Sequence, residues 1–354
     1  MSRPMQSGPT SSSPDEPRRA PSSRLTWVDS GRGIAIVLVA LYHSASWLLG
    51  AGFPIDTWRQ INEALSALRM PLFFVLAGLF AAKWLVSSWG DLWRSKIRLF
   101  AWVFIVWEAI GSVVYMIGLR MKGNGIDVLG AARDLLLSPF APRFELWFIW
   151  ALALFFIVAK LLRRVDWRIQ LAVAGLASAI ALSGWETANV GWSGSIKYFF
   201  FFLAGLYLRQ TILSIGRMRI GPVAILAVAT WVGLSTVIAI FSLRWVPGLY
   251  FVDCLLGVFT GIMASRALAG VPRLVSIGSN TMPIYLAHTP VIILTAYAVS
   301  LLATVVPFGA TAWLLPPIVA AFAITVSLLL SNAAQKPPLA LLYRPPGRGV
   351  ARVS

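Results

Sequence analysis

Ten runs of mostly apolar residues, each about 20 residues long and so long enough to cross a bilayer core as a helix, follow one another along this chain. They are centred near Leu41, Ala77, Trp107, Leu154, Ala177, Leu203, Thr230, Gly257, Pro290 and Ile324. Because 58% of the 354 residues are hydrophobic and only 12% are charged, a water-facing fold of this length could not bury the apolar surface. We predict an all-α, polytopic membrane protein with about ten transmembrane helices.

The distribution of basic residues predicts the orientation of these helices. The formal charge of +17 comes from short groups of Lys and Arg between the apolar runs, which favours membrane lipids or an anionic cosubstrate over nucleic acid as partners. With the N-terminus inside, 22 of the 30 Lys and Arg residues fall on the inner side, as the positive-inside rule requires. We therefore expect a multi-pass protein of the inner or plasma membrane with both termini in the cytoplasm.

The apolar runs divide the chain into three parts. Residues 1–24 are rich in Ser, Pro and Arg and lack the apolar region of a signal peptide, so they predict a disordered cytoplasmic tail. Residues 25–333 form the predicted transmembrane domain, and residues 334–354 a basic cytoplasmic tail. The longest predicted outer loop, residues 119–144, contains an amphipathic segment at 126–137 that could lie at the interface.

Two hexapeptides in different apolar runs resemble each other. Residues 74–79 read FVLAGL, and residues 201–206 read FFLAGL. An internal duplication would explain the similarity, and small residues that allow close helix packing explain it as well.

Both histidines of the chain lie in apolar runs, where ionisable groups are costly and therefore mark candidate functional sites. His43 follows Arg32 by eleven residues, which on a continuous helix is about 16 Å along the axis and close to three turns. The two would then share a face, with Arg32 at the cytoplasmic mouth, within pairing reach of Asp29, and His43 near mid-bilayer. This suits a substrate with an anionic end, because arginine binds phosphate and neutral histidine is a base near pH 7. From these residues alone, a structural histidine and a positive-inside arginine are an equally good explanation.

Four further ionisable residues are candidates of a weaker kind. His288 should lie at a depth comparable to His43, and a structural polar contact is favoured over a catalytic role for it. Glu108 is the one acidic residue well inside an apolar run, and it could orient an imidazole or bind a proton. Glu145 and Asp253 lie near predicted helix ends, where a solvated or capping role is the default.

Residues 28–43, which read VDSGRGIAIVLVALYH, resemble the opening signature of the acyltransferase 3 family. Members of that family are multi-helix membrane O-acyltransferases of surface glycans, antibiotics and lipids. The arginine, ten intervening residues and the histidine are the most specific feature of the signature. Three further stretches agree in order and place: residues 70–78 (MPLFFVLAG), 145–148 (ELWF) and 284–288 (IYLAH). The resemblance spans nearly all ten predicted helices.

The resemblance implies that His43 is the catalytic histidine and that Arg32 is its partner in handling the acyl donor. Supporting polar candidates are Asp29, Glu108, Tyr285 and His288. The chain departs from the family pattern at Ala77, where the family usually has Ser. It also departs in the basic cluster before the third helix, which often reads Arg, two residues, Arg, whereas three residues separate Arg94 from Arg98 here. These two arginines are retained as donor-binding candidates.

The expected activity is transfer of a short acyl group, of the acetyl or succinyl type, from cytoplasmic acyl-CoA to a hydroxyl of an extracytoplasmic glycan or lipid-linked sugar. His43 would act as general base, or carry the group as a transient acyl-histidine. Acyl-CoA is a cosubstrate, and neither a metal nor a bound cofactor is expected. Some relatives append an extracytoplasmic hydrolase-like domain, so an extracytoplasmic partner is a further expectation. The alternatives are a proton-coupled transporter or exporter of a polar solute, in which buried histidines and Glu108 form a proton relay, and a non-catalytic membrane scaffold.

Overall fold

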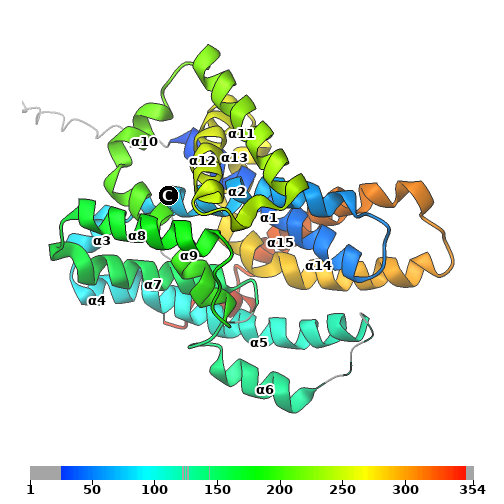
Figure 1. The fold of residues 1–354 in the computed structure, drawn as a ribbon. Coiled ribbons are helices and arrows are strands. Elements are labelled where there is room, and N and C mark those ends of the chain that lie inside the picture. Colours follow the sequence, from blue (N-terminus) through cyan, green and yellow to red (C-terminus); the bar gives the residue numbers. More distant parts are fainter. Residues whose placement is uncertain (1–24, 122, 124, 126, 143, 348–354) are drawn as a thin grey trace, which may run out of the picture.

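The computed structural model describes residues 25–121, 123, 125, 127–142 and 144–347, and within these residues it contains helices and connecting segments but no strand (Figure 1). The longer helices are α1 (Thr26–Gly50), α2 (Thr57–Gly78), α5 (Arg98–Met121), α9 (Val190–Tyr207), α11 (Pro222–Phe241), α12 (Leu249–Ala267), α14 (Thr281–Ala303) and α15 (Leu315–Ala333). The shorter helices are α3 (Ala82–Val86), α4 (Trp89–Leu92), α6 (Val128–Leu137), α7 (Trp147–Leu161), α8 (Trp167–Leu182), α10 (Arg209–Ile215) and α13 (Pro272–Ser279). The predicted N-terminal tail and the last seven residues of the predicted C-terminal tail lie outside the described residues.

The all-α, polytopic prediction is confirmed, whereas the count of ten spans is not. The centre of each predicted run falls within a helix. By length and composition, seven helices of the described chain can cross a membrane, and an eighth span arises if α9 and α10, which meet at an angle of 83°, form one broken span. Helices α7 and α8 have only 15 and 16 residues, fewer than the about 20 that a full crossing takes. The orientation in the membrane stays a prediction.

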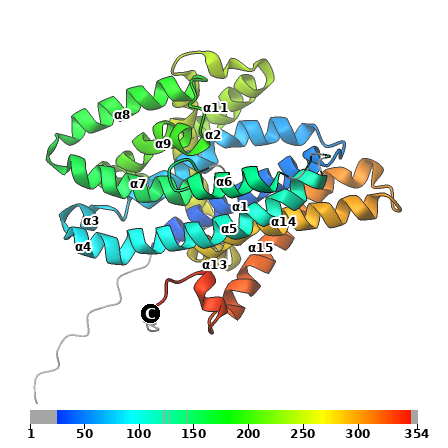
Figure 2. The ribbon, with the colours of Figure 1, turned by 90° about the horizontal axis from the view of Figure 1, so that it is seen from below.

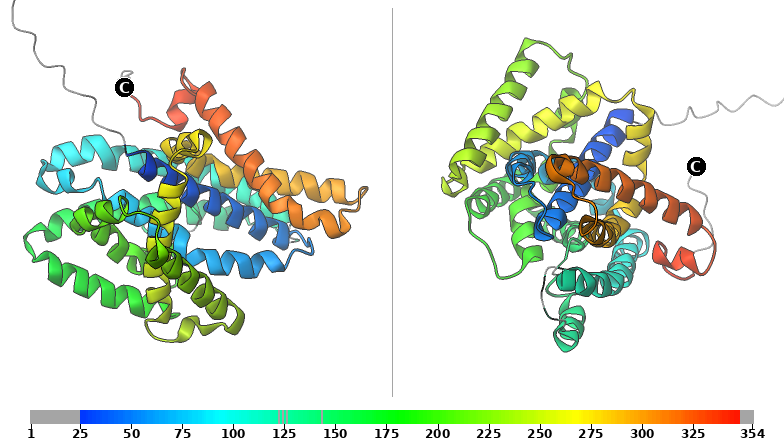
Figure 3. Two further views of the ribbon diagram at one scale, coloured as in Figure 1. Left: turned by 90° about the horizontal axis from the view of Figure 1, so that it is seen from above. Right: turned by 90° about the vertical axis from the view of Figure 1, so that its right-hand side faces the viewer.

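Helix α1 runs through the middle of the molecule and packs against α2, α12, α13, α14 and α15 (Figure 3). Helix α7 lies beside α3, and α4 and α8 lie at the same end of the bundle, while α14 and the second half of α5 extend towards the other end (Figures 1 and 2). The segments that precede α7 and α9 consequently end part-way along the bundle. They face the second half of α1, where they line a cavity with it.

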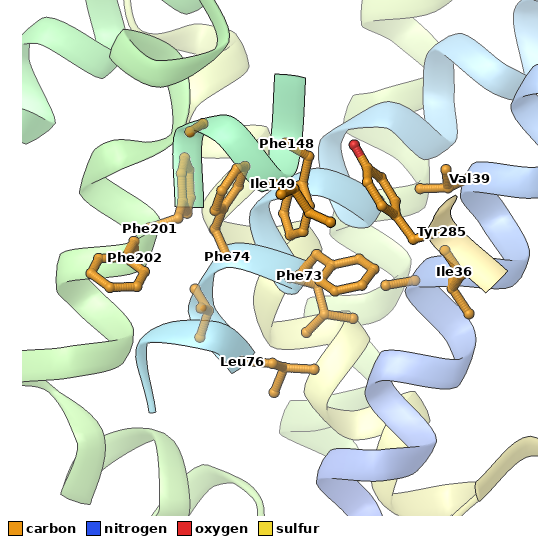
Figure 4. Close-up of a cluster of buried hydrophobic side chains, with 14 of the residues drawn as sticks. Ile36, Val39, Phe73, Phe74, Leu76, Phe148, Ile149, Phe201, Phe202 and Tyr285 are labelled. Carbon is orange, nitrogen blue, oxygen red and sulfur yellow. The ribbon is translucent and has the colours of Figure 1, made fainter. Parts of the chain in front are cut away.

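Aromatic side chains join α2, α7, α9 and α14 into one buried core (Figure 4). The ring centroid of Phe74 lies 4.6 Å from that of Phe148 and 5.1 Å from that of Phe155. Phe148 in turn lies 5.3 Å from the ring of Tyr285. Aromatic pairs at such distances stabilise a core beyond the area that they bury, so the start of α7 is held firmly against α2 and α14.

The two similar hexapeptides pack against each other. A Cβ atom on Gly78 of α2 would lie 2.1 Å from the carbonyl oxygen of Phe202, and a Cβ atom on Gly205 of α9 would lie 2.1 Å from that of Val75. Neither position has space for a side chain, because the two helix backbones touch there. Close packing of small residues, one of the two explanations offered by the sequence, therefore accounts for both glycines.

At the end of the bundle that holds the start of α1, a buried lysine of α7 binds the end of α3 and the residue that follows it. The ammonium group of Lys160, a residue that is only 2% exposed, donates to the carbonyl oxygens of Trp84, Leu85 and Ser87. Three carbonyl partners satisfy all three N–H groups of the lysine. This contact fixes the turn between α3 and α4, which leads into the basic cluster of the third predicted helix.

Part of the predicted C-terminal tail packs against α5. The indole N–H groups of Trp102 and Trp107 donate to the carbonyl oxygens of Leu341 and Leu342, each at 2.7 Å. Tyr343 is buried beside Trp107, and burial raises the pKa of its hydroxyl to about 12. At least residues 341–343 are therefore attached to the helical body.

Candidate active site

The predicted arrangement of the first helix depends on its continuity, and α1 is one unbroken helix from Thr26 to Gly50. His43 and Arg32 therefore lie about 16 Å apart along its axis. His43 stands about two turns before the end of α1, and its depth in the bilayer stays a prediction. Arg32 pairs with Asp29, as predicted, at 3.6 Å, and its guanidinium also lies 5.0 Å from the centre of the Phe80 ring.

His43 meets a carboxylate that comes from another part of the chain. Its Nδ1 atom lies 3.4 Å from Oε1 of Glu145, the second residue before α7. The hydroxyl of Tyr115 donates to the same carboxylate oxygen, and the hydroxyl of Tyr285 donates to the backbone carbonyl of Glu145. Two tyrosines on α5 and α14 thus hold Glu145 in place, and its carboxylate faces the imidazole.

A solvated or helix-capping role was the default expectation for Glu145, and it was wrong. The side chain of Glu145 is only 14% exposed, because the aromatic packing of Phe148 draws the start of α7 into the core. The one available signal was its position at the head of the ELWF stretch, which belongs to the family pattern. The contact with His43 depends on the tertiary fold and has no counterpart in local sequence.

His288 lies beside His43, at the comparable depth that the sequence predicted, with the two ring centroids 5.3 Å apart. Its Nδ1 lies 2.7 Å from the carbonyl oxygen of Tyr285, and its Nε2 lies 3.2 Å from the hydroxyl of Thr289. A carbonyl oxygen can only accept a hydrogen bond, so Nδ1 carries the proton of the neutral ring. Nε2 then accepts a hydrogen bond from the Thr289 hydroxyl. Both nitrogens of this fully buried ring are therefore engaged by α14 itself, which fits the structural contact that was favoured for His288.

A cavity of about 560 Å³ opens in front of His43. Its wall is formed by the second half of α1, the middle of α2, the segment before α7 and the segment around the start of α9. In the described part of the chain, Nε2 of His43 makes no hydrogen bond, whereas Nδ1 faces Glu145. The nitrogen that remains available for a substrate is therefore Nε2.

One charged pair lines the same cavity away from His43. Lys197 of α9 forms an ion pair with Glu186, which lies in the connection between α8 and α9. The hydrogen bond from Lys197 holds the pKa of the Glu186 carboxyl below its ordinary value, so this carboxylate is ionised at neutral pH. The positive charge of Lys197 is thereby neutralised within the protein.

Glu108 does not orient an imidazole, which is one of the two roles that the sequence suggests for it. It is 1% exposed, and in the described chain neither histidine lies within ion-pair distance of its carboxylate. Its Oε2 has no hydrogen-bond partner among the described groups. It lines a small cavity of about 20 Å³ together with Tyr115 and Glu145. Glu145, not Glu108, is the carboxylate beside His43.

The basic cluster begins in a π-helix, η1 (Trp93–Ile97), that leads directly into α5. A π-helix takes one more residue in each hydrogen-bonded turn than an α-helix does. The chain has one more residue between Arg94 and Arg98 than the family pattern usually has, so the π-helix can absorb this departure. Arg94 pairs with Asp91 at 3.0 Å, and Arg98 donates to the carbonyl oxygen of Pro346. No described contact joins either arginine to Arg32.

Fold and site together define a helical, multi-pass membrane protein with a histidine and a carboxylate paired at the wall of a cavity. Residues 25–332 match the family of the acyltransferase domain, so the chain belongs to the acyltransferase 3 family. The inner membrane protein YcfT of Escherichia coli (strain K12) is 23% identical over 356 residues, which cover 90% of this chain and 96% of that protein. No solved structure matches the chain.

Proposed function

We propose that this protein transfers a short acyl group, such as acetyl or succinyl, from cytoplasmic acyl-CoA to a hydroxyl of an extracytoplasmic glycan or lipid-linked sugar in the inner or plasma membrane. The observation that carries the proposal is the approach of Glu145 to Nδ1 of His43, which leaves Nε2 at the cavity wall. A carboxylate in this position orients an imidazole and stabilises its protonated form, which is the arrangement of a general base.

In the proposed reaction the acceptor hydroxyl attacks the thioester carbonyl while Nε2 of His43 takes its proton. A carbon–oxygen bond forms and the carbon–sulfur bond breaks, and the proton then passes from His43 to the leaving CoA thiolate. Glu145 stabilises the positive imidazole during this step. The separation of 3.4 Å is long for a hydrogen bond, and catalytic hydrogen bonds commonly shorten when substrate binds.

The basic residues near the start of α1 and α5 are the proposed donor site. Arginine forms paired, charge-assisted hydrogen bonds with phosphate, and Arg32, Arg94 and Arg98 would hold the CoA phosphates. From Arg32 the pantetheine arm has to reach about 16 Å along α1 to His43. Pro346, near the end of the described chain, accepts a hydrogen bond from Arg98 at this end of the bundle, where the positive-inside rule predicts the cytoplasm.

The decisive test is the chemistry of His43. Membranes that contain the wild-type protein should release thiol from acetyl-CoA or succinyl-CoA, and membranes with an equal amount of His43→Ala should show only the background of membranes without the protein. Retention of full release by His43→Ala would refute the proposal.

A comparison of surface glycans would identify the acceptor. Cells with the wild-type protein, with the deletion and with His43→Ala should be compared by mass spectrometry, and the two defective strains should lack the mass of the same acyl group. If vesicles instead transport a polar solute without modifying it and release no CoA, the protein is a carrier.

A further inference from the structure

A second cavity, of about 490 Å³, lies beside the cavity of His43 and shares two wall residues with it, Tyr42 and Arg69. It lies where α1 ends and α2 begins. Its charged and polar wall residues are Ser46, Arg59, Asn62, Glu63, Ser66, Arg69 and Arg244. Since Tyr42 precedes His43 directly, a molecule that occupies both cavities passes the imidazole.

Arg69 is the residue that most requires a ligand. It is only 8% exposed and lies within a membrane-spanning helix, where a buried charge is costly and is retained for function. Its guanidinium stacks 4.2 Å from the centre of the Tyr42 ring and donates to the carbonyl oxygen of Asn62 at 3.1 Å. No carboxylate of the described chain pairs with it. One neutral hydrogen bond and one aromatic ring leave most of its five donors unused.

Arg244 is fixed at the wall of the same cavity. Its Nε lies 3.2 Å from Oε1 of Glu63, and its Nη2 donates to the hydroxyl of Ser66 at 2.6 Å. The ring of Tyr250 lies 4.4 Å from the guanidinium carbon. These contacts hold the second arginine in one orientation, which lowers the entropic cost of binding a ligand.

The two cavities differ in charge. The wall of the second cavity carries three arginines and one glutamate, and Arg59 pairs with Asp56 beside this wall, so one positive charge is left over. The wall of the His43 cavity carries two positive residues, Arg69 and Lys197, and two carboxylates, Glu145 and Glu186, so its charges balance. An anionic group is therefore attracted to the second cavity, and an uncharged sugar hydroxyl can lie in the first.

We propose that the second cavity binds an oxyanion of the acceptor, a phosphate or a carboxylate, with Arg69 as its main ligand and Arg244 as the second. The anion would hold the acceptor so that a hydroxyl of the same molecule lies at Nε2 of His43. This inference rests on the proposed acyl transfer and narrows the acceptor to anionic glycans or phosphate-linked sugars. Arginine suits both groups, because its planar donor pair matches their oxygen pairs.

Binding can be measured without knowledge of the natural acceptor. The purified full-length protein in phosphatidylcholine nanodiscs is titrated at constant ionic strength with inorganic phosphate, glucuronate or glucose, and its thermal unfolding is followed. A ligand that binds the native state raises the unfolding temperature in a saturable way. We expect this for phosphate, glucuronate or both, which tells which oxyanion the site takes, and not for uncharged glucose. No stabilisation by either anion would overturn the proposal.

Variants locate the site. Arg69→Gln should weaken the anion effect about tenfold or more, since a charge-assisted pair is lost, whereas Arg133→Gln, which removes an arginine that is 70% exposed on α6, should not change it. An unchanged effect in Arg69→Gln would overturn the assignment. If Arg69→Gln does not fold, the double variant Glu63→Gln and Arg244→Gln, which removes the pair without leaving a lone charge, should still weaken binding, and full affinity would overturn the proposal.

His43→Ala separates this inference from the proposed function. It should lose thiol release from acyl-CoA and keep the anion effect. If it keeps thiol release, the proposed function fails and the anion result stands on its own. If Arg69→Gln keeps full anion binding while His43→Ala is inactive, the anion site fails and acyl transfer stands.

Discussion

Oε1 of Glu145 lies 3.4 Å from Nδ1 of His43, although one residue precedes α7 and the other belongs to α1. The hydroxyl of Tyr115 donates to the same oxygen, so the carboxylate cannot turn away from the imidazole without losing a hydrogen bond. Within the proposed function, Glu145 is a positioning residue that acts through His43.

Replacement of Glu145 by Gln should therefore lower kcat for thiol release on the order of 100-fold with little change in KM for acyl-CoA. Gln is nearly the same size, but it cannot stabilise a positive imidazole. A merely structural role would lower the amount of folded protein and leave kcat per folded molecule intact. Asp166→Asn, which neutralises an exposed carboxylate at the start of α8 where Asn is an equally good cap, is the matched control. Wild-type kcat in Glu145→Gln would contradict the assignment.

Replacement of Arg94 or Arg98 by Ala should raise KM for acyl-CoA about three- to tenfold and leave kcat nearly unchanged, because a lost contact with phosphate weakens ground state and transition state alike. Initial rates of thiol release over a range of acyl-CoA concentrations measure both constants. Arg217→Ala removes a basic residue from the same predicted side of the membrane and should have no effect. If Arg94→Ala and Arg98→Ala have the same KM for acyl-CoA as the wild type and Arg217→Ala, the basic cluster is not the donor site.

Gly78→Ala and Gly205→Ala should each destabilise the protein by about 1–3 kcal/mol or more, because the added methyl group would lie 2.1 Å from a backbone oxygen of the other helix. The unfolding temperature and the monodisperse fraction in detergent are the measurements. Gly233→Ala in α11 is a suitable comparison, since a Cβ atom there meets nothing within 4 Å. If all three variants unfold at the same temperature, α2 and α9 do not touch as described.

Lys160→Met should cost about 1–3 kcal/mol, the usual penalty when buried polar groups lose their partner. Met has a similar length and fills the space, but it cannot donate to the carbonyl oxygens of Trp84, Leu85 and Ser87. Lys336→Met changes an exposed lysine and should leave the unfolding temperature as it is. Wild-type stability in Lys160→Met would show that these hydrogen bonds contribute nothing net.

The all-α class could be predicted because it depends on local composition. A run of about 20 apolar residues has to satisfy its backbone groups within itself in a bilayer, whatever surrounds it. The same reasoning located the helices, including α7 and α8, but it overestimated their lengths, since these two helices have 15 and 16 residues.

Parts of the site were also accessible from local spacing. Arg32 and His43 belong to one continuous helix, so three turns separate them in the fold as in the sequence. The pairing of Asp29 with Arg32 follows from their spacing of three residues in the same way.

The sequence by itself thus determined the membrane class, the family pattern and the position of His43, all of which depend on neighbouring residues. Only the tertiary structure decided which carboxylate lies beside His43, since the packing of α7 against α2 and α14 positions Glu145 there. It also placed Arg69 between two cavities, where no carboxylate of the described residues pairs with it. Contacts between distant helices depend on how whole side-chain surfaces fit together, and no periodicity within one segment encodes that fit.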